Sequence, residues 1–228
     1  MGSVWGKFLK ISIFGESHGS QIGAVMDGFP PGFTLDMENI MEDMERRAPG
    51  KSKLTTGRKE SDLPIVVSGI FKEKTTGAPF CVLINNKDTK SGDYEPFSKI
   101  PRPSHSDFTG HLRYKGCNDF RGGGHFSGRL TAPLVFAGAL CKGYLKKQYG
   151  VEITGEIYSV GGCINRAKGD EVDEMIVKKI EEAMKEAASV GGVISCKATG
   201  ICAGIGSPIF DNVESRISAV IYSIPGVK

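Results

Sequence analysis

Two of the four histidines stand in polar turns bounded by glycine or proline, where an imidazole can exchange a proton with a ligand. His18 directly follows Ser17, and His105 lies in the run Arg102-Pro103-Ser104-His105-Ser106-Asp107. Histidine titrates near neutral pH, which suits it to general acid catalysis. Considered alone, each histidine is explained more simply as a structural or surface residue. The two turns therefore identify two candidates, but they do not determine the role of either histidine.

A glycine-rich stretch is the next candidate. Three consecutive glycines, 122–124, lie between Arg121 and Arg129 and lead into a long apolar segment. A glycine loop that opens a helix can bring backbone amides close to a phosphate, and the helix N-terminus adds partial positive charge. His125, inside this loop, would touch an anion bound there. The stretch alone fits a flexible hinge before a core helix equally well.

Five arginines lie at element ends or in glycine- and proline-rich turns, and four more cations lie close to two of them. The arginines are Arg46, Arg47, Arg102, Arg121 and Arg129, and the nearby cations are Lys51, Lys53, Arg58 and Lys59. Arginine forks suit phosphate and carboxylate, so this set favours a ligand with several negative charges. At a helix end, arginines also complement the helix dipole, which is sufficient to explain the first two. The sequence contains no P-loop, dinucleotide fingerprint or G-x-S-x-G elbow.

Composition limits the classes of protein. The chain has 228 residues, a net charge of +3, 24% charged residues and 39% hydrophobic residues, as expected for one large or two small globular domains. The small net charge argues against nucleic-acid binding through bulk charge. Six scattered cysteines form no C-x-x-C pair, which predicts reduced thiols and no metal site. No apolar run approaches the roughly 18 residues of a membrane span. We therefore expect a cytoplasmic protein with neither nucleic-acid nor membrane partners.

Apolar periodicity and turn residues predict a mixed set of elements. The expected strands are 8–14, 22–26, 64–71, 79–86, 151–160 and 193–201, and the first two form a hairpin. The expected helices are one capped by Asp36 and ending at Arg47, 126–149, 170–188, and one from Asp211 or Asn212 to about 223. A polar connection covers 86–115 and carries the His105 run. Its length favours a functional role.

Four runs in order along the chain resemble signatures of the chorismate synthase family. They are Gly15-Glu16-Ser17-His18-Gly19 with Asp27-Gly28-Phe29-Pro30-Pro31-Gly32, then Arg46-Arg47-Ala48-Pro49-Gly50, then the Arg102–Asp107 run, then Asp119-Phe120-Arg121-Gly122-Gly123-Gly124 with Ser127-Gly128-Arg129. The runs extend from residue 6 to about 140, and later segments such as 204–210 fit as well. Matches this long and ordered make the resemblance specific.

The resemblance implies an α+β fold described as a β-α-β sandwich, with central helices, led by 126–149, flanked by antiparallel or mixed sheets in a homotetramer. It implies a lyase that removes phosphate from 5-enolpyruvylshikimate 3-phosphate by 1,4-anti elimination. This reaction gives chorismate and is the last step of the shikimate pathway. Family members need reduced FMN, and some reduce the flavin with NADPH. The substrate is a small molecule with two carboxylates and a phosphate, which agrees with a need for several arginines.

The resemblance also implies residue roles. His18 would serve the leaving phosphate, and His105 would protonate the reduced flavin. The expected substrate-binding residues are Ser17, Arg46, Arg47, Arg102 and Arg129. The expected flavin-binding residues are Arg47, Lys53, His125, Phe126, Ser127 and Arg129.

Three departures from the family pattern bear on these roles. Ser104 stands where the family has glycine, and His125 and Phe126 replace residues of its Arg-Ser-Ser-Ala-Arg run. Family members are also longer, and their Arg-x-Asp-Pro signature has no match here, so no residue of 1–228 is assigned to removal of the ring proton. We expect residues 1–228 to be one chorismate synthase domain that is incomplete at its C-terminus. The alternative is a shortened, non-catalytic relative that retains anion or flavin binding or oligomer contacts.

Overall fold

The computed structural model describes residues 2–50, 54, 60–87, 91–167 and 171–228. Most of the predicted cationic loop of 51–59, including Lys53, therefore lies outside the described residues. The chain divides into two compact units. The first comprises Met1–Ala48, Arg58–Gly143 and Gly204–Lys228, and the second comprises Pro49–Gly57 and Tyr144–Ala203.

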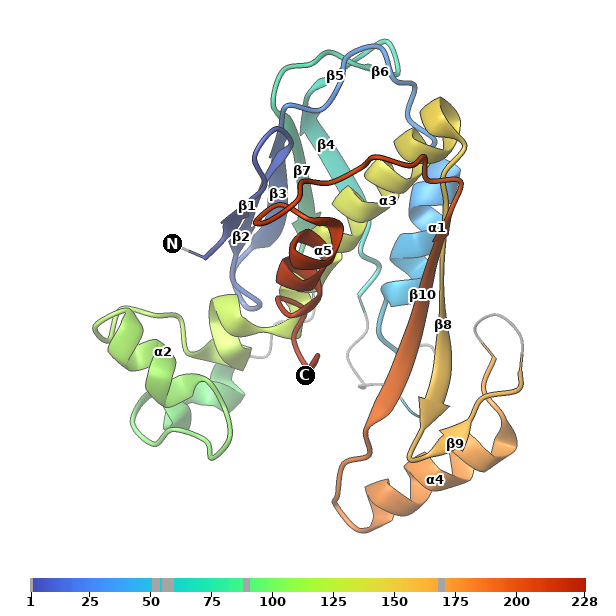
Figure 1. Ribbon diagram of the computed structural model, residues 1–228. Helices are drawn as coiled ribbons and strands as arrows, with labels where there is room; N and C mark the ends of the chain where they lie inside the picture. The colour runs from blue at the N-terminus through green and yellow to red at the C-terminus, as the bar shows by residue number, and fades with distance from the viewer. Residues whose placement is uncertain (1, 51–53, 55–59, 88–90, 168–170) are drawn as a thin grey trace. The chain divides into compact units, whose positions relative to one another are not determined.

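The first unit contains a five-stranded antiparallel sheet in the order β1-β2-β3-β7-β4 (Figure 1). The strands are β1 (Val4–Trp5), β2 (Lys10–Gly15), β3 (Gln21–Asp27), β4 (Pro64–Ser68) and β7 (Phe80–Asn85). A small hairpin of β5 (Ile70–Phe71) and β6 (Lys74–Thr75) lies between β4 and β7 in sequence. The predicted hairpin of β2 and β3 is confirmed, with Lys10 opposite Asp27 and Gly15 opposite Ile22. Its turn carries His18, so the hairpin register fixes the end of the sheet at which this histidine lies.

The core of the first unit follows from alternation along the two central strands. Every second residue of β3 and β7 faces inward, and these side chains are at most 1% exposed: Ile22, Ala24, Met26, Phe80, Val82 and Ile84. Alternation of this kind is typical of a sheet that buries one face. The Phe80 ring packs against Phe136 of α3 (Thr131–Tyr149), with ring centroids 5.8 Å apart. The sheet and this helix thus share one core.

The helix α1 (Met37–Arg47) begins and ends where the sequence predicts. Asp36 accepts a hydrogen bond from the backbone N–H of Asn39 at 3.2 Å, which satisfies one of the free amides of the first turn. Ile40 and Met44, one helical turn apart, are buried. Because these two buried side chains anchor α1 to the core, the position of Arg47 in the last turn of the helix is fixed.

The central helix begins five residues later than predicted. Two short 3₁₀ turns, η2 (Arg121–Phe126) and η3 (Gly128–Leu130), flank the extended residue Ser127, and α3 starts only at Thr131. The three consecutive glycines have φ angles of 61°, 111° and 53°, which a right-handed helix does not allow. The glycines therefore form a compact loop in front of the helix.

The connection 86–115 contains two elements that periodicity did not predict. They are the 3₁₀ turn η1 (Ser91–Ser98) and the helix α2 (Asp107–Arg113). Phe108 and Leu112 of α2 are 58% and 60% exposed, so this helix buries no apolar stripe that a sequence pattern could signal. The prediction of a long polar connection was thus wrong in structure, although the segment does carry the His105 run.

The second unit has a three-stranded antiparallel sheet in the order β10-β8-β9 and the helix α4. The bounds are β8 (Glu152–Val160), β9 (Cys163–Ile164), α4 (Glu174–Lys185) and β10 (Gly192–Thr199). The helix is shorter than the predicted 170–188 at both ends: it begins at Glu174, and it ends at Lys185, shortly before Ala187 with φ of 51°. Of the predicted apolar face, Ile176 is buried, but Met175 and Met184 are exposed.

The helix α5 (Val213–Ile221) completes the first unit. Asn212 caps it by accepting a hydrogen bond from the backbone N–H of Ser215 at 2.8 Å. The chain is α+β, as predicted, and the paired strands of the described residues are antiparallel. All six cysteines are free thiols. Among the described residues, no helix has both the length and the apolar character needed to cross a membrane.

Candidate functional site

His18 is a buried histidine next to the Ser17 hydroxyl. It is 8% exposed, and its neighbour Ser17 is fully buried. The Ser17 hydroxyl lies 3.3 Å from the carbonyl oxygen of Arg121 and 3.1 Å from His18 Nδ1. A carbonyl only accepts, so both contacts are satisfied when the hydroxyl donates to Arg121 and His18 Nδ1–H donates to the hydroxyl. In this arrangement Nδ1 of His18 is the nitrogen engaged by the Ser17 hydroxyl.

The glycine loop passes directly between the two candidate histidines. A Cβ atom at Gly122 would lie 2.2 Å from His18 Cε1 and 3.0 Å from Ser17 Oγ. A Cβ atom at Gly123 would lie 3.4 Å from both Cε1 and Nε2 of His105. Only residues without side chains allow the backbone to approach His18 this closely. The loop therefore brings together two histidines that are 87 positions apart in sequence.

His105 is held by a carboxylate. Its Nδ1 lies 2.7 Å from Asp107 Oδ1, and the His105 side chain is 32% exposed. Arg102 donates from Nε and Nη2 to the two Asp107 oxygens, each at 2.8 Å. This guanidinium lowers the pKa of the Asp107 carboxyl far below its usual range, so the carboxylate stays ionised.

Two aromatic side chains of η1 join the surroundings of the two histidines. The Tyr94 ring meets the His18 ring edge to face, with centroids 4.8 Å apart. The Arg102 guanidinium lies over the Phe97 ring at 4.6 Å and over the Tyr94 ring at 5.6 Å. Such contacts contribute roughly 0.5–1.5 kcal/mol each. Tyr94 thus contacts both His18 and the arginine that holds the partner of His105.

Arg121, at the start of the loop, is paired within its own segment. It donates from Nε and Nη2 to the two oxygens of Asp119, at 2.8 and 2.7 Å. The pairing raises the pKa of Arg121 and lowers that of Asp119, mainly through these hydrogen bonds. The backbone of this segment also accepts the Ser17 hydroxyl described above. Arg121 therefore anchors the loop against the His18 turn.

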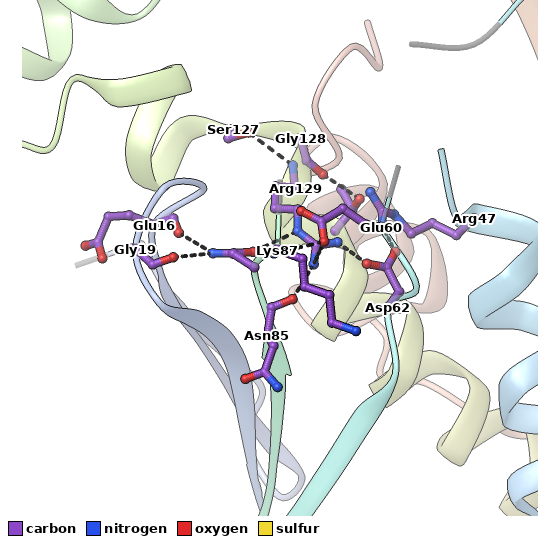
Figure 2. Close-up of polar contacts among 12 residues, drawn as sticks. Glu16, Gly19, Arg47, Glu60, Asp62, Asn85, Lys87, Ser127, Gly128 and Arg129 are labelled. Carbon is purple, nitrogen blue, oxygen red and sulfur yellow. Dashed lines mark hydrogen bonds and ion pairs between the residues drawn. The ribbon is translucent and has the colours of Figure 1, made fainter. Parts of the chain in front are cut away.

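Two of the predicted ligand-binding arginines meet at one buried carboxylate. Asp62, which is 2% exposed, lies between the side chains of Arg47 and Arg129, and each of its oxygens accepts one arginine (Figure 2). The Arg129 side chain is 2% exposed, whereas that of Arg47 is 18% exposed. Buried charges need such partners. An anion that approaches this pair meets the guanidinium of Arg47 before that of Arg129.

Arg129 is also joined to the His18 turn through Asn86. Arg129 Nε donates to Asn86 Oδ1 at 2.9 Å, and the Asn86 amide donates to the carbonyl oxygens of Glu16 and Gly19 at 3.0 and 2.8 Å. A further hydrogen bond runs from Arg129 Nη2 to the Asn85 carbonyl at 3.2 Å. The arginine therefore stabilises the turn that carries His18, in addition to any contact with a ligand.

The three consecutive residues predicted to bind flavin line a cavity of about 570 Å³ in the first unit. His125, Phe126 and Ser127 form part of its wall, together with Trp5 and Tyr114. Trp5, Tyr114 and Phe126 are each 40–41% exposed, and the Arg216 guanidinium lies over the Trp5 ring at 4.6 Å. This volume is typical of small-molecule sites, and the aromatic lining fits a flavin ring. Arg47 and Arg129 are not among the described residues that line the cavity.

The cavity adjoins the histidines at Ser127, whose Cβ lies 3.8 Å from the position of a Cβ at Gly123. His125 is fixed there by both ring nitrogens. Nδ1–H donates to the Gly15 carbonyl at 2.8 Å, and Nε2 accepts from the Ser3 hydroxyl at 2.9 Å. Arg46, by contrast, is exposed on the last turn of α1, where complementing the helix dipole accounts for it.

Sequence reasoning missed several residues that hold the site together. Asp107 and Asp119 lie inside the signature-like runs, which assign them no role, and no sequence pattern singles out Tyr94, Asp62 or Asn86. The spacing of the two aspartates from Arg102 and Arg121 was a usable signal, since a carboxylate two to five residues from an arginine can form a fork-like pair. No local pattern pointed to Asp62, whose arginine partners lie 15 and 67 positions away.

These features define an α+β protein whose glycine loop gathers two histidines and several arginines, the composition expected for binding a small anion and transferring protons. The sequence profile described as chorismate synthase matches residues 9–228. The chain is 42% identical to chorismate synthase of Chitinophaga pinensis over 224 residues, covering 98% of this chain and 64% of that protein. It is 42% identical to chorismate synthase of Ralstonia pickettii over 240 residues, covering 100% of this chain and 65% of that protein.

A solved structure described as a crystal structure of chorismate synthase is also similar. Its TM-score is 0.77 at 25% sequence identity, and the match covers 97% of this chain and 67% of that one. This chain belongs to the chorismate synthase family. It spans about two thirds of the length of these relatives.

Proposed function

We propose that this chain is part of a chorismate synthase, the lyase that converts 5-enolpyruvylshikimate 3-phosphate into chorismate by 1,4-anti elimination of phosphate. The single observation that carries the proposal is the placement of His18 and His105 against adjacent glycines of one loop. A reaction that expels phosphate needs a proton or a cation on the leaving oxygens, and a second proton donor must lie close by for the cofactor.

In this proposal His18 serves the leaving phosphate. Its Nδ1–H is committed to Ser17, so Nε2 would carry the proton that is transferred to a phosphate oxygen. Burial of this ring keeps competing water away, which strengthens its interaction with an anion. Arg47 and Arg102, with Ser17, would bind the carboxylates and the phosphate, and Arg46 and Arg129 complete the proposed substrate-binding set.

The proposed cofactor is reduced FMN, with NADPH as a possible source of electrons for it. When bound, reduced FMN would supply electron density as the bond between the ring carbon and the phosphate oxygen breaks. His125, Phe126 and Ser127 would hold the flavin in the cavity, with Arg47, Arg129 and Lys53 as further proposed contacts. His105 would present a proton towards it. We further propose a cytoplasmic homotetramer.

The test uses two proteins, because the chain spans about two thirds of its relatives. The first is residues 1–228, and the second, termed the fusion, continues residues 1–228 with the part of the Chitinophaga pinensis relative that the chain does not cover. Each is incubated with 5-enolpyruvylshikimate 3-phosphate and dithionite-reduced FMN, and chorismate and phosphate are measured. We expect stoichiometric chorismate and phosphate from the fusion and negligible turnover from residues 1–228.

Each other outcome is informative. A folded fusion that binds reduced FMN but produces no chorismate would contradict the proposed reaction. Robust turnover by residues 1–228 would show that the remaining third is dispensable, against our expectation. Binding without turnover in both proteins would instead favour the non-catalytic relative.

A further inference from the structure

The Asp107 carboxylate determines which nitrogen of His105 carries the proton. Asp107 Oδ1 lies 2.7 Å from His105 Nδ1. An ionised carboxylate only accepts hydrogen bonds, so a contact this short requires a proton on Nδ1. Arg102 Nη2 also lies 3.2 Å from the same nitrogen. The Arg102 contact would suit the tautomer that has no proton on Nδ1. It is longer than the contact with Asp107, so we take the carboxylate contact to determine the tautomer.

The carboxylate itself is held in place from several directions. Arg102 binds both oxygens through its side chain, and its backbone N–H donates to Oδ2 at 3.0 Å. The guanidinium in turn rests on the Phe97 ring. Asp107 is 7% exposed and begins α2, where a negative charge is favoured by the helix dipole. Rotation of the carboxylate would break its three hydrogen bonds from Arg102.

The opposite edge of the imidazole faces the glycine loop. Nε2 and Cε1 of His105 are the atoms nearest to the position of a Cβ at Gly123, and Ser127 is the next nearest. Because Nδ1 is engaged by Asp107, Nε2 is the nitrogen available to a ligand at the loop. The glycine loop thus lies against the edge of the His105 ring that carries Nε2.

We infer that Asp107 is a positioning residue, which keeps a proton on His105 Nδ1 so that Nε2 is the atom that exchanges a proton with the ligand. As an acid, the imidazolium releases its Nε2 proton to the ligand and returns to the neutral Nδ1–H form, while Asp107 remains a carboxylate throughout. The identity of the ligand rests on the proposed function, whereas the assignment of the His105 tautomer rests only on its contact with Asp107.

The chain contains a matched control for this arrangement. Asp119 and Arg121 form the same forked pair, with side-chain contacts of 2.8 and 2.7 Å and a backbone N–H contact of 3.0 Å. No hydrogen bond from a histidine to Asp119 occurs in the part of the chain that the structure describes. The two carboxylates therefore differ in whether a histidine donates a hydrogen bond to them, since His18 acts on Asp119 only through its charge.

The decisive variant is Asp107→Asn. Arg102 has only donors, so the amide oxygen of the asparagine must stay on Arg102 and its NH₂ group must face His105 Nδ1. The imidazole can then accept at Nδ1 only if its proton moves to Nε2. We expect ¹⁵N NMR of histidine-labelled residues 1–228 at about pH 8, where ordinary histidine is neutral, to report Nδ1–H for wild-type His105 and Nε2–H for Asp107→Asn. The Asp119→Asn variant should leave the His105 signals unchanged, and His105→Ala identifies them.

The inference is overturned if wild-type His105 is the Nε2–H tautomer, a result that needs no variant to fold. It is equally overturned if Asp107→Asn, folded by circular dichroism, keeps the wild-type tautomer. In the fusion, if active, we expect Asp107→Asn to lower kcat by about 10²-fold or more with little change in KM, since correct protonation of a general acid is worth this much. A tautomer switch with unchanged kcat would overturn the positioning role. An inactive wild-type fusion would contradict the proposed function and leave the tautomer result standing.

Discussion

His18 and His105 meet at the same glycine loop but are held in opposite ways. His18 is buried against the Ser17 hydroxyl, the Tyr94 ring and the backbone of Gly122, and its charged form also interacts with the Asp119 carboxylate. His105 is about one-third exposed and is bound to the Asp107 carboxylate. The two imidazoles therefore reach the same loop with different partners at Nδ1, a hydroxyl for His18 and a carboxylate for His105.

The largest expected effect comes from removing each ring in turn. In the fusion, His18→Ala and His105→Ala should each lower kcat by about 10²–10⁴-fold, the usual contribution of general acid–base catalysis. Chorismate formation under saturating substrate and reduced FMN measures the loss. His111→Ala is the matched control, because His111 is exposed and lies outside the loop. A near-normal rate for either candidate would remove that histidine from the mechanism.

The second effect is on the contact between the loop and His18. Gly122→Ala should displace His18, because the new Cβ would lie 2.2 Å from Cε1 and the residue has φ of 61°. We expect turnover to fall and the free energy of unfolding to drop by roughly 1–3 kcal/mol, from left-handed backbone strain and the steric clash. Thermal unfolding and chorismate formation measure both changes. Gly128→Ala should change neither, since no atom beyond its own stretch of backbone lies within 4 Å of its Cβ position and its φ is not positive. Equal behaviour of the two variants would mean that the loop does not position His18.

The two histidines also show what the sequence could and could not reveal. Their motifs, the β2–β3 hairpin and the Asp36-capped helix α1 were predictable, because local turn chemistry and alternation determine them. The late start of α3 was not, since the extended backbone of Ser127, with ψ of 143°, interrupts a continuous apolar pattern. The sequence also could not predict that Arg47 and Arg129 share the Asp62 carboxylate. Arg129 is 67 positions away from Asp62, and only the tertiary fold brings the two residues together.

A smaller effect should appear in acid. The arginine partners lower the pKa of both Asp107 and Asp119 in the folded protein. Each carboxylate therefore adds stability that is complete above the unfolded pKa of about 3.9 and is lost as the pH falls through the lower folded pKa. Asp107→Asn and Asp119→Asn should each cost about 1–3 kcal/mol near pH 7, as expected for hydrogen bonds to charged groups, and less near pH 3.

Urea unfolding of the three proteins at these two pH values measures the difference. Asp107→Asn should reduce the pH dependence more than Asp119→Asn, because Asp107 also accepts a hydrogen bond from His105. An equal reduction in both variants would indicate that the histidine adds nothing to the carboxylate in the folded state. That result would weaken the contrast between the two histidines.

The smallest effect concerns the backbone that carries each histidine. Near His18 the left-handed position is taken by a glycine, Gly15, with φ of 97°, whereas next to His105 it is taken by Ser104, with φ of 58°. A residue with a Cβ in this region costs about 1 kcal/mol, which glycine avoids. Ser104→Gly should therefore raise the free energy of unfolding by up to about 1 kcal/mol, measured by urea unfolding.

Ser106→Gly is the control for Ser104→Gly. Ser106 has an ordinary φ of −75° and makes no capping hydrogen bond, so the substitution adds only flexibility and should lower stability slightly. If both variants lose stability alike, the turn before His105 is not strained. In that case the serine at position 104 is tolerated without a backbone cost, and the two histidine turns differ only in their side-chain partners.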